Sequence, residues 1–238
     1  MQFYGIIKKI LYFFERIIMR SYIKALIFDL DGTLADTIPA IAEAINMTMD
    51  ELGFPHRSEV EIRGAIGHGP RYLVEECLPK DAKESDPTLI DRALKIYNEA
   101  YGKTYMHTEK LYEGLEDAIL ELSKYYRIAV LSNKQDAYVK ALVDQLLPEG
   151  ICEVAMGTVE GTPPKPDPTL ARRLTSLMGV NPRDCVMIGD SDVDILTAEN
   201  AEFDIISVSW GYASKTKLLL HGAQDIVNSP FELVDYFK

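Results

Sequence analysis

The stretch from Lys24 to Thr37, which reads KALIFDLDGTLADT, constrains the fold of this chain more than any other. Ala25 to Phe28 form a short apolar run that can be buried on both faces, as central strands of parallel sheets are. The run stops at Asp29, Asp31 and Gly32. Because residues i and i+2 of an extended chain point to the same side, both carboxylates can face the crevice where open α/β sheets bind ligands. Two carboxylates this close repel each other. The repulsion is relieved if one of them is protonated, or if a cation such as Mg²⁺ neutralises both.

Beyond Leu111 the sequence alternates between predicted strands and predicted helices. Apolar runs indicate strands at 127–131, 153–156, 184–188 and 204–208, and helical patterns lie at 117–125, 135–147, 168–178 and 193–200. Strands that alternate with helices are typical of a doubly wound parallel sheet with right-handed crossovers. The predicted fold class is therefore α/β, and the carboxyl ends of the strands deliver polar residues to one edge of the sheet.

The segment between the first strand and the rest of the sheet is predicted to be helical. Helical spacing runs from Pro39 to Gly53, and further helices are indicated at 58–66, 70–78 and 86–106, with a polar stretch at 79–87. No strand pattern intervenes. We therefore predict a helical cap domain at 38–107, able to act as a lid, on an α/β core domain formed by 21–37 and 108–238.

The first twenty residues differ from the rest and predict an amphipathic helix at 1–20. The segment is too short to span a bilayer and is interrupted by the charged Glu15 and Arg16, and it lacks the cleavage site of a signal peptide. Its positive charge would permit attachment to a membrane surface. We favour docking on the protein's own core or on a second subunit, which leaves an oligomer open, and Met19 is an alternative start of the chain.

Charge and cysteine content narrow the partners and the compartment. The net charge of −12 argues against a nucleic-acid partner, and an anionic substrate would need a metal and a positioned lysine. Cys77, Cys152 and Cys185 are scattered, with no CxxC pair. This pattern indicates free thiols in a reducing compartment, and we therefore predict a cytoplasmic location.

Three further polar clusters follow the predicted strands: Ser132 with Asn133, then Lys165, then Asp190 with Asp194. Lys165 lies between two prolines that stiffen its loop, and the two aspartates, four residues apart at a helix start, share a face. Taken singly, each cluster has a simpler interpretation as a turn, a surface lysine or a helix cap. Asp192, on another side of its helix, we interpret as a cap.

Together, the four clusters resemble the haloacid dehalogenase superfamily, whose motifs are DxDGT, a strand-terminal Ser or Thr, a loop Lys, and GDxxxD. They stand here in that order as DLDGT, LSN, KPDP and GDSDVD, within a match from about residue 22 to the C-terminus. The resemblance implies a Rossmann-like core with a cap after the first strand, and Mg²⁺ as cofactor. The implied metal ligands are Asp29, Asp190, Asp194 and the backbone carbonyl of Asp31.

The resemblance also implies a role for each motif. Asp29 is the candidate nucleophile, since a carboxylate can attack phosphorus to give an aspartyl-phosphate. Asp31 can protonate the leaving oxygen and later activate water. Ser132 and Asn133 can hold phosphate oxygens, and Lys165 can neutralise the charge of the nucleophile and the phosphate.

Several features narrow the activity within the superfamily. The second aspartate, Asp31, favours phosphoryl chemistry, because members that dehalogenate lack it. The segment 37–52 lacks the histidine of β-phosphoglucomutase-like members, which favours hydrolysis. The most detailed resemblance, carried by AIGHGPRYLVEE, KPDPTLARRLTSLMG and VSWGY, is to phosphoglycolate phosphatases and implies a small phosphorylated acid as substrate. Pyrophosphatases and sugar-phosphate phosphatases share the pattern, and an inactive partner-binding relative is a less favoured alternative.

Selectivity for the substrate is expected in the cap, since the core motifs all serve phosphate. His68 and Arg71 flank a Gly-rich turn that could dip toward the site, and Arg71 could bind a carboxylate through two hydrogen bonds. A solvated arginine and a turn histidine are the alternative interpretation.

Overall fold

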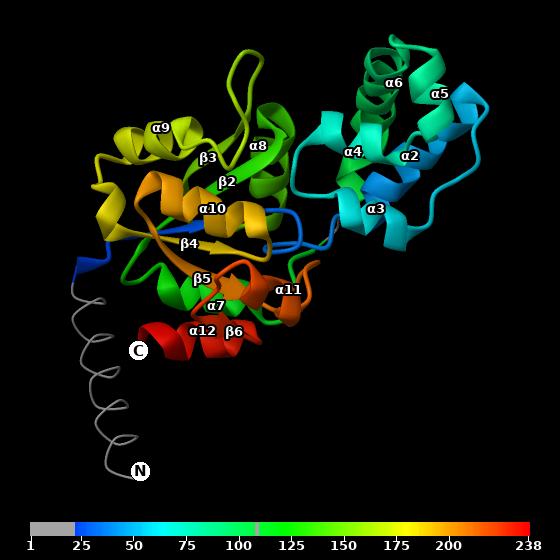
Figure 1. The fold of residues 1–238 in the computed structure, drawn as a ribbon. Helices are drawn as coiled ribbons and strands as arrows, with labels where there is room; N and C mark the ends of the chain where they lie inside the picture. Colours follow the sequence, from blue (N-terminus) through cyan, green and yellow to red (C-terminus); the bar gives the residue numbers. More distant parts are fainter. Residues whose placement is uncertain (1–21, 108–109) are drawn as a thin grey trace, which may run out of the picture.

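The computed structural model describes residues 22–107 and 110–238, so the predicted helix at 1–20 and Met19 lie outside the described residues. An α/β core and a group of helices formed by residues 38–107, which we call the cap, lie side by side (Figure 1). Within the described residues, no helix combines the length and the apolar character needed to cross a membrane.

The core is built on one parallel sheet of six strands in the order β3-β2-β1-β4-β5-β6. The strands are β1 (Ala25–Phe28), β2 (Arg127–Gln135), β3 (Cys152–Thr158), β4 (Cys185–Gly189), β5 (Asp204–Val208) and β6 (Ile226–Val227). The fully buried β1 pairs with β2 on one side and with β4 on the other. This order confirms the predicted doubly wound α/β class, whereas β6 is too short to give a sequence pattern.

Helices cover both faces of the sheet because side chains alternate along its strands. Leu26 and Phe28 belong to an apolar cluster with α7 (Leu115–Leu122), α8 (Asp136–Leu146) and α12 (Pro230–Phe237). Ala25 and Ile27 face the other way, toward α9 (Thr169–Met178) and α10 (Asp192–Ala201). The short α11 (Lys215–Leu220) packs through Leu218 on a smaller cluster.

The cap encloses an apolar cluster of its own. It consists of α2 (Ile38–Leu52), α3 (Glu59–Ala65), α4 (Pro70–Cys77), α5 (Lys80–Ser85), α6 (Leu89–Thr104) and the 3₁₀ turn η1 (Tyr105–His107). Ile41, Ile45 and Met49 of α2 lie in this cluster at the predicted helical spacing. The polar stretch at 79–87, predicted to separate two helices, contains a helix of its own, because α5 forms there. This helix buries none of its residues and so leaves no apolar periodicity in the sequence.

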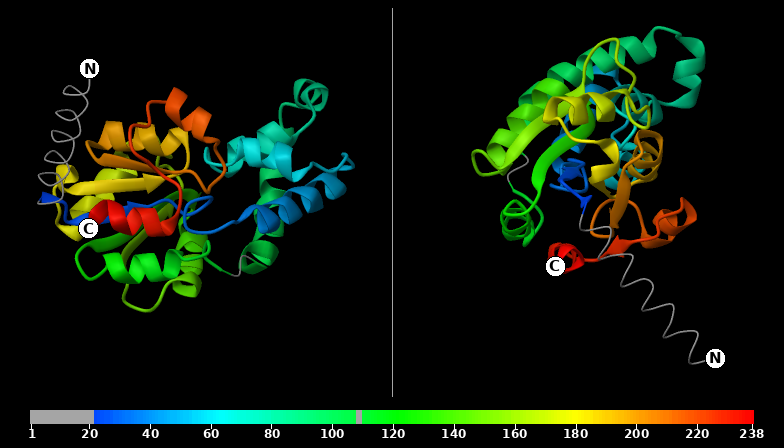
Figure 2. Two further views of the ribbon diagram at one scale, coloured as in Figure 1. Left: turned by 90° about the horizontal axis from the view of Figure 1, so that it is seen from below. Right: turned by 90° about the vertical axis from the view of Figure 1, so that its left-hand side faces the viewer.

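The strands end toward the cap, which places the loops after them at the boundary between the two parts (Figure 2). The strand predicted at 127–131 continues to Gln135, so that β2 extends four residues beyond Leu131. These four residues, Ser132 to Gln135, are polar and partly or fully buried. The extension carries them from the sheet to the cap.

Candidate active site

Asp29 follows β1 directly and is buried at the boundary with the cap. Its Oδ1 lies 3.0 Å from Nζ of Lys165, and no described group donates a hydrogen bond to this oxygen. Burial raises the pKa of Asp29 to about 8, against the opposing charge of Lys165 and with the help of the neighbouring carboxylates. The ammonium of Lys165 therefore compensates the charge of this carboxylate only in part.

Lys165, from the loop between β3 and α9, lies among three oxygen atoms. Its Nζ is 2.7 Å from Asp194 Oδ1, 3.0 Å from Asp29 Oδ1 and 3.2 Å from the carbonyl oxygen of Leu131. Burial alone would lower the pKa of Lys165, but Asp194 and Asp29 raise it above its ordinary value. The lysine therefore keeps its positive charge beside the candidate nucleophile.

The side chain of Asn133 fixes the loop that carries Lys165. The Lys165 N–H donates to Asn133 Oδ1 at 2.6 Å, and Asn133 Nδ2 donates to the Lys165 carbonyl at 2.9 Å. The same Nδ2 donates to the carbonyl of Gly67 in the cap at 2.8 Å. Because these bonds occupy its amide, the phosphate contact predicted for Asn133 is left to its backbone and stays a prediction.

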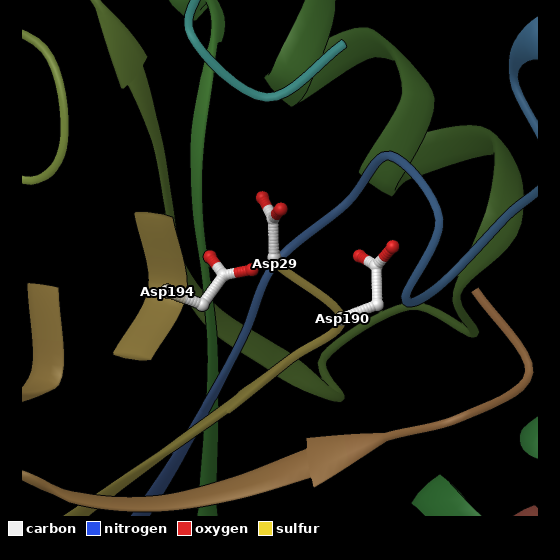
Figure 3. A group of neighbouring side chains, drawn as sticks. All are labelled: Asp29, Asp190 and Asp194. Atoms are coloured by element: carbon white, nitrogen blue, oxygen red, sulfur yellow. The ribbon is translucent and has the colours of Figure 1, made fainter. Parts of the chain in front are cut away.

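Asp190, which follows β4, and Asp194, in the first turn of α10, bring carboxylates toward Asp29 (Figure 3). One oxygen from each of these three residues lies within 4.8 Å of the others. Thr33 donates to Asp190 Oδ1 at 2.9 Å, and the Tyr212 N–H donates to its Oδ2 at 2.6 Å. Burial, with a further contribution from Asp194, raises the pKa of Asp190 to about 7.

These three carboxylates, beside the single ammonium of Lys165, fit a site for a metal ion. Buried charges that lack a counter-charge are costly, and hard carboxylate oxygens are the ligands that Mg²⁺ prefers. Asp29 Oδ1 accepts no hydrogen bond, and the ammonium of Lys165, 3.0 Å away, balances the three carboxylates only in part, which favours a further cation here. Asp194 is more fully engaged, because Lys165 binds its Oδ1 and Ser191 donates to its Oδ2 at 2.6 Å.

Asp31 does not join this cluster with its side chain. Its Oδ1 accepts a hydrogen bond from Thr37 at 2.6 Å and lies 2.9 Å from Nζ of Lys134. Lys134 Nζ also donates to the hydroxyl of Tyr101, on α6 of the cap, at 2.8 Å. Burial alone would lower the pKa of Lys134, but Asp31 and then Tyr101 raise it. The backbone carbonyl of Asp31 stays the predicted metal ligand.

A cavity between the core and the cap reaches the candidate nucleophile. Asp29, Asp31, Ser132 and Lys134 line it from the core. The cap contributes Ile41, Ile66, Gly67, Gly69, Pro70, Leu73, Tyr97, Asn98 and Tyr101. A concave site of this kind, with apolar cap residues and polar core residues around it, is typical of small-molecule binding.

His68 and Arg71 are not brought to this cavity, although the turn between them is. Arg71 pairs with Asp91 at 2.7 Å on the cap surface, where its side chain is 59% exposed. The ring of His68 packs on Tyr72, with 4.7 Å between the ring centroids. A substrate contact by either side chain has no support in this geometry and stays a prediction.

The interpretation of Asp192 as a helix cap is wrong. Ser191 caps α10, since its Oγ accepts the N–H of Asp194 at 3.3 Å. Asp192 instead pairs with Lys217 at 3.1 Å.

Sequence reasoning missed three residues that hold the site together, namely Thr37, Lys134 and Tyr212. The hydroxyl of Tyr212 accepts the Thr37 N–H at 2.8 Å while its backbone binds Asp190, a contact between distant segments that no local pattern encodes. Lys134 did leave a signal. It lies two residues after Ser132 in an extended segment, so both side chains belong on the same side of the strand.

Comparison with known proteins shows the family of this chain. A family model described as haloacid dehalogenase-like hydrolase matches residues 26–208, which run from β1 through the whole cap to the end of β5. The chain therefore belongs to the haloacid dehalogenase-like hydrolases.

Within this family the chain is phosphoglycolate phosphatase-like. It is 31% identical over 205 residues to the phosphoglycolate phosphatase of Colwellia psychrerythraea. The aligned residues cover 84% of this chain and 91% of the relative. A haloacid dehalogenase-like hydrolase from Streptococcus pneumoniae is 26% identical with a TM-score of 0.81, over 92% of this chain and 100% of that chain. CbbY from Rhodobacter sphaeroides, solved in complex with phosphate, is 25% identical with a TM-score of 0.71, over 89% and 96%. The predicted superfamily and enzyme class, a phosphoric monoester hydrolase, are confirmed.

Proposed function

We propose that this chain is a Mg²⁺-dependent phosphatase that hydrolyses a small phosphorylated metabolite through an aspartyl-phosphate on Asp29. The observation that supports this most directly is the buried carboxylate of Asp29, 3.0 Å from the ammonium of Lys165 and at the end of a cavity that Asp31 also lines. A nucleophile, a fixed positive charge and a second carboxyl group are the groups that the reaction requires.

In the first step, a carboxylate oxygen of Asp29 attacks phosphorus while the bond from phosphorus to the leaving oxygen breaks. Asp31 donates a proton to that oxygen, and the product alcohol departs. In the second step, water attacks phosphorus, Asp31 accepts its proton, and the bond between phosphorus and Asp29 breaks. Throughout, Lys165 offsets the negative charge of the phosphoryl oxygens, and Ser132, which lines the cavity, donates a hydrogen bond to one of them.

The residues that would hold Mg²⁺ are Asp29, Asp190 and the backbone carbonyl of Asp31, with Asp194 in the same cluster. When bound, the ion supplies positive charge against the nucleophile and the phosphate oxygens, which lowers the repulsion between two anions. The overall charge of −12 makes such local compensation necessary.

For the substrate, we propose a phosphomonoester of phosphoglycolate-like size. The named relative is a phosphoglycolate phosphatase, and Tyr97 and Tyr101 of α6 line the cavity that reaches the nucleophile. Cys77, Cys152 and Cys185 are free thiols, which supports a reducing compartment such as the cytoplasm.

The test is hydrolysis of a substrate panel by the full chain. Phosphoglycolate, pyrophosphate and several sugar phosphates are compared in Mg²⁺ and in EDTA, with phosphate release as the readout. We expect Mg²⁺-dependent release from phosphoglycolate, loss of it in Asp29→Asn, and unchanged release in Asp50→Asn, which alters an exposed aspartate of the cap. The proposal would be overturned if the wild type released phosphate from none of the panel members, or if Asp29→Asn kept full activity.

A further inference from the structure

We propose that Lys134 is a positioning residue that orients Asp31 for proton transfer, and that the cap holds Lys134 in place through Tyr101. This inference rests on the proposed function. The inference adds a direct contact path from the cap to the acid/base carboxylate of Asp31, formed by protein side chains and independent of the substrate.

The end of β2 connects the core to the cap through consecutive side chains. Asn133 Nδ2 donates to the Gly67 carbonyl at 2.8 Å, Lys134 Nζ to the Tyr101 hydroxyl at 2.8 Å, and Gln135 Nε2 to Asn98 Oδ1 at 2.9 Å. Of these three residues, Lys134 alone also contacts a predicted catalytic side chain, since its Nζ lies 2.9 Å from Asp31. Movement of the cap relative to the core would therefore alter the surroundings of Asp31.

Lys134 is held firmly at this junction. Only 8% of its surface is exposed, and its ammonium lies 4.6 Å from the centroid of the Tyr101 ring in addition to its bond with the hydroxyl. A buried ion pair stabilises a fold little compared with well-packed apolar side chains. Stability alone therefore gives a poor account of a lysine at this position, whereas a positioning role explains why its charge is aimed at Asp31.

The contacts of Asp31 are one-sided. Lys134 and Thr37 both bind Oδ1, and among the described residues no hydrogen bond or ion pair reaches Oδ2. A carboxyl group fixed through one oxygen presents the other in a defined direction, and Asp31 lines the same cavity as Asp29. We assign the proton transfer to Oδ2 and the orientation of the group to the contacts on Oδ1.

A positioning role predicts a dependence on the leaving group that other roles do not. Alkoxides need a proton to depart, whereas 4-nitrophenolate is stable enough to leave without one. The experiment compares kcat/KM, which reports the first step, for phosphoglycolate, ethyl phosphate and 4-nitrophenyl phosphate. Lys134→Met retains the length of the side chain and removes its charge, and Lys140→Met, an exposed lysine of α8, is the matched control.

We expect Lys134→Met to lose about 100-fold in kcat/KM for both alkyl phosphates and less than about tenfold for 4-nitrophenyl phosphate, in line with the usual contribution of general acid catalysis. Lys140→Met should match the wild type on all three substrates. Tyr101→Phe, which removes the hydroxyl and keeps the ring, should give the same pattern with smaller losses, and it decides the question by itself if Lys134→Met does not fold.

Each contrary pattern excludes the inference in a different way. A loss confined to phosphoglycolate would show that Lys134 binds the substrate carboxylate. Equal losses on all three substrates would show a structural role. A wild type inactive toward all three in Mg²⁺ would overturn the proposed function itself, and the inference with it.

Discussion

Replacing Asp29 with Asn should abolish turnover and, at the same time, stabilise the metal-free protein. Burial raises the pKa of Asp29 from 3.8 to about 8, so at neutral pH the folded state either carries an unfavourable charge or takes up a proton. A pH of 7 lies about 3 units above the pKa of Asp29 in the unfolded chain. At ~1.4 kcal/mol per unit, the raised pKa lowers the stability of the folded state by about 4 kcal/mol. Asparagine has nearly the same shape and no charge to bury.

The effect should depend on pH in a defined direction. Between about pH 4 and pH 8 the folded protein binds the Asp29 proton more tightly than the unfolded chain, so the stability of the wild type falls as pH rises through this window. The variant lacks this contribution. Its advantage should therefore be small, about 1 kcal/mol, at pH 4.5 and should grow to about 4 kcal/mol at pH 7.

Thermal denaturation in EDTA measures the difference. For a chain of this size 1 kcal/mol corresponds to about 2–4 °C, so Asp29→Asn should melt at least about 8 °C above the wild type at pH 7. Asp50→Asn, with its exposed side chain, should melt with the wild type. A Tm for Asp29→Asn at or below that of the wild type at pH 7, or a gain independent of pH, would refute the assignment of Asp29 as a buried charge that Lys165 compensates only in part.

Three further predictions concern the metal site and the cap. Mg²⁺ should raise the Tm of the wild type more at pH 8 than at pH 6, because protons on Asp29 and Asp190, whose pKa values burial raises to about 8 and about 7, compete with the ion; equal shifts would contradict this. Gly32→Ala should weaken Mg²⁺ binding at least about tenfold in titration calorimetry, because a side chain at residue 32 would displace the proposed metal ligand Asp190. Gly32 has φ of 83°, and an added Cβ would lie 2.6 Å from Asp190 Oδ2, so unchanged affinity would show that Asp190 is not a ligand. Arg71→Ala should leave KM for phosphoglycolate unchanged, since Arg71 is exposed and paired with Asp91, whereas a rise absent for 4-nitrophenyl phosphate would restore the carboxylate contact suggested by the sequence.

The sequence predicted the part of the site that depends on strand ends. Asp29 and Asp190 each follow a strand of the same parallel sheet, and Ser132 lies in the last part of β2. Because β1 lies between β2 and β4, the meeting of these residues follows from the topology. Lys165 joins them from the loop after β3. The partners of these residues could not be predicted in the same way. Tyr101 reaches Lys134 only because α6 of the cap packs in a particular register over the end of β2, and tertiary packing of this kind has no periodic signature in either segment.

The early end predicted for β2 has a physical cause that also bears on function. Ser132, Asn133 and Lys134 are polar, and such residues after an apolar run normally indicate a turn. Here the strand continues beside β3, with a register shift before Gln135 pairs with Thr158. Gly157 of β3 permits the close approach, since a Cβ there would lie 2.4 Å from the Lys134 carbonyl. Lys134 thus stands within a strand instead of a loop, and groups supported by regular structure are held more precisely than groups on loops. The continuation of the strand beyond its predicted end therefore suits Lys134 to hold Asp31 in a fixed orientation.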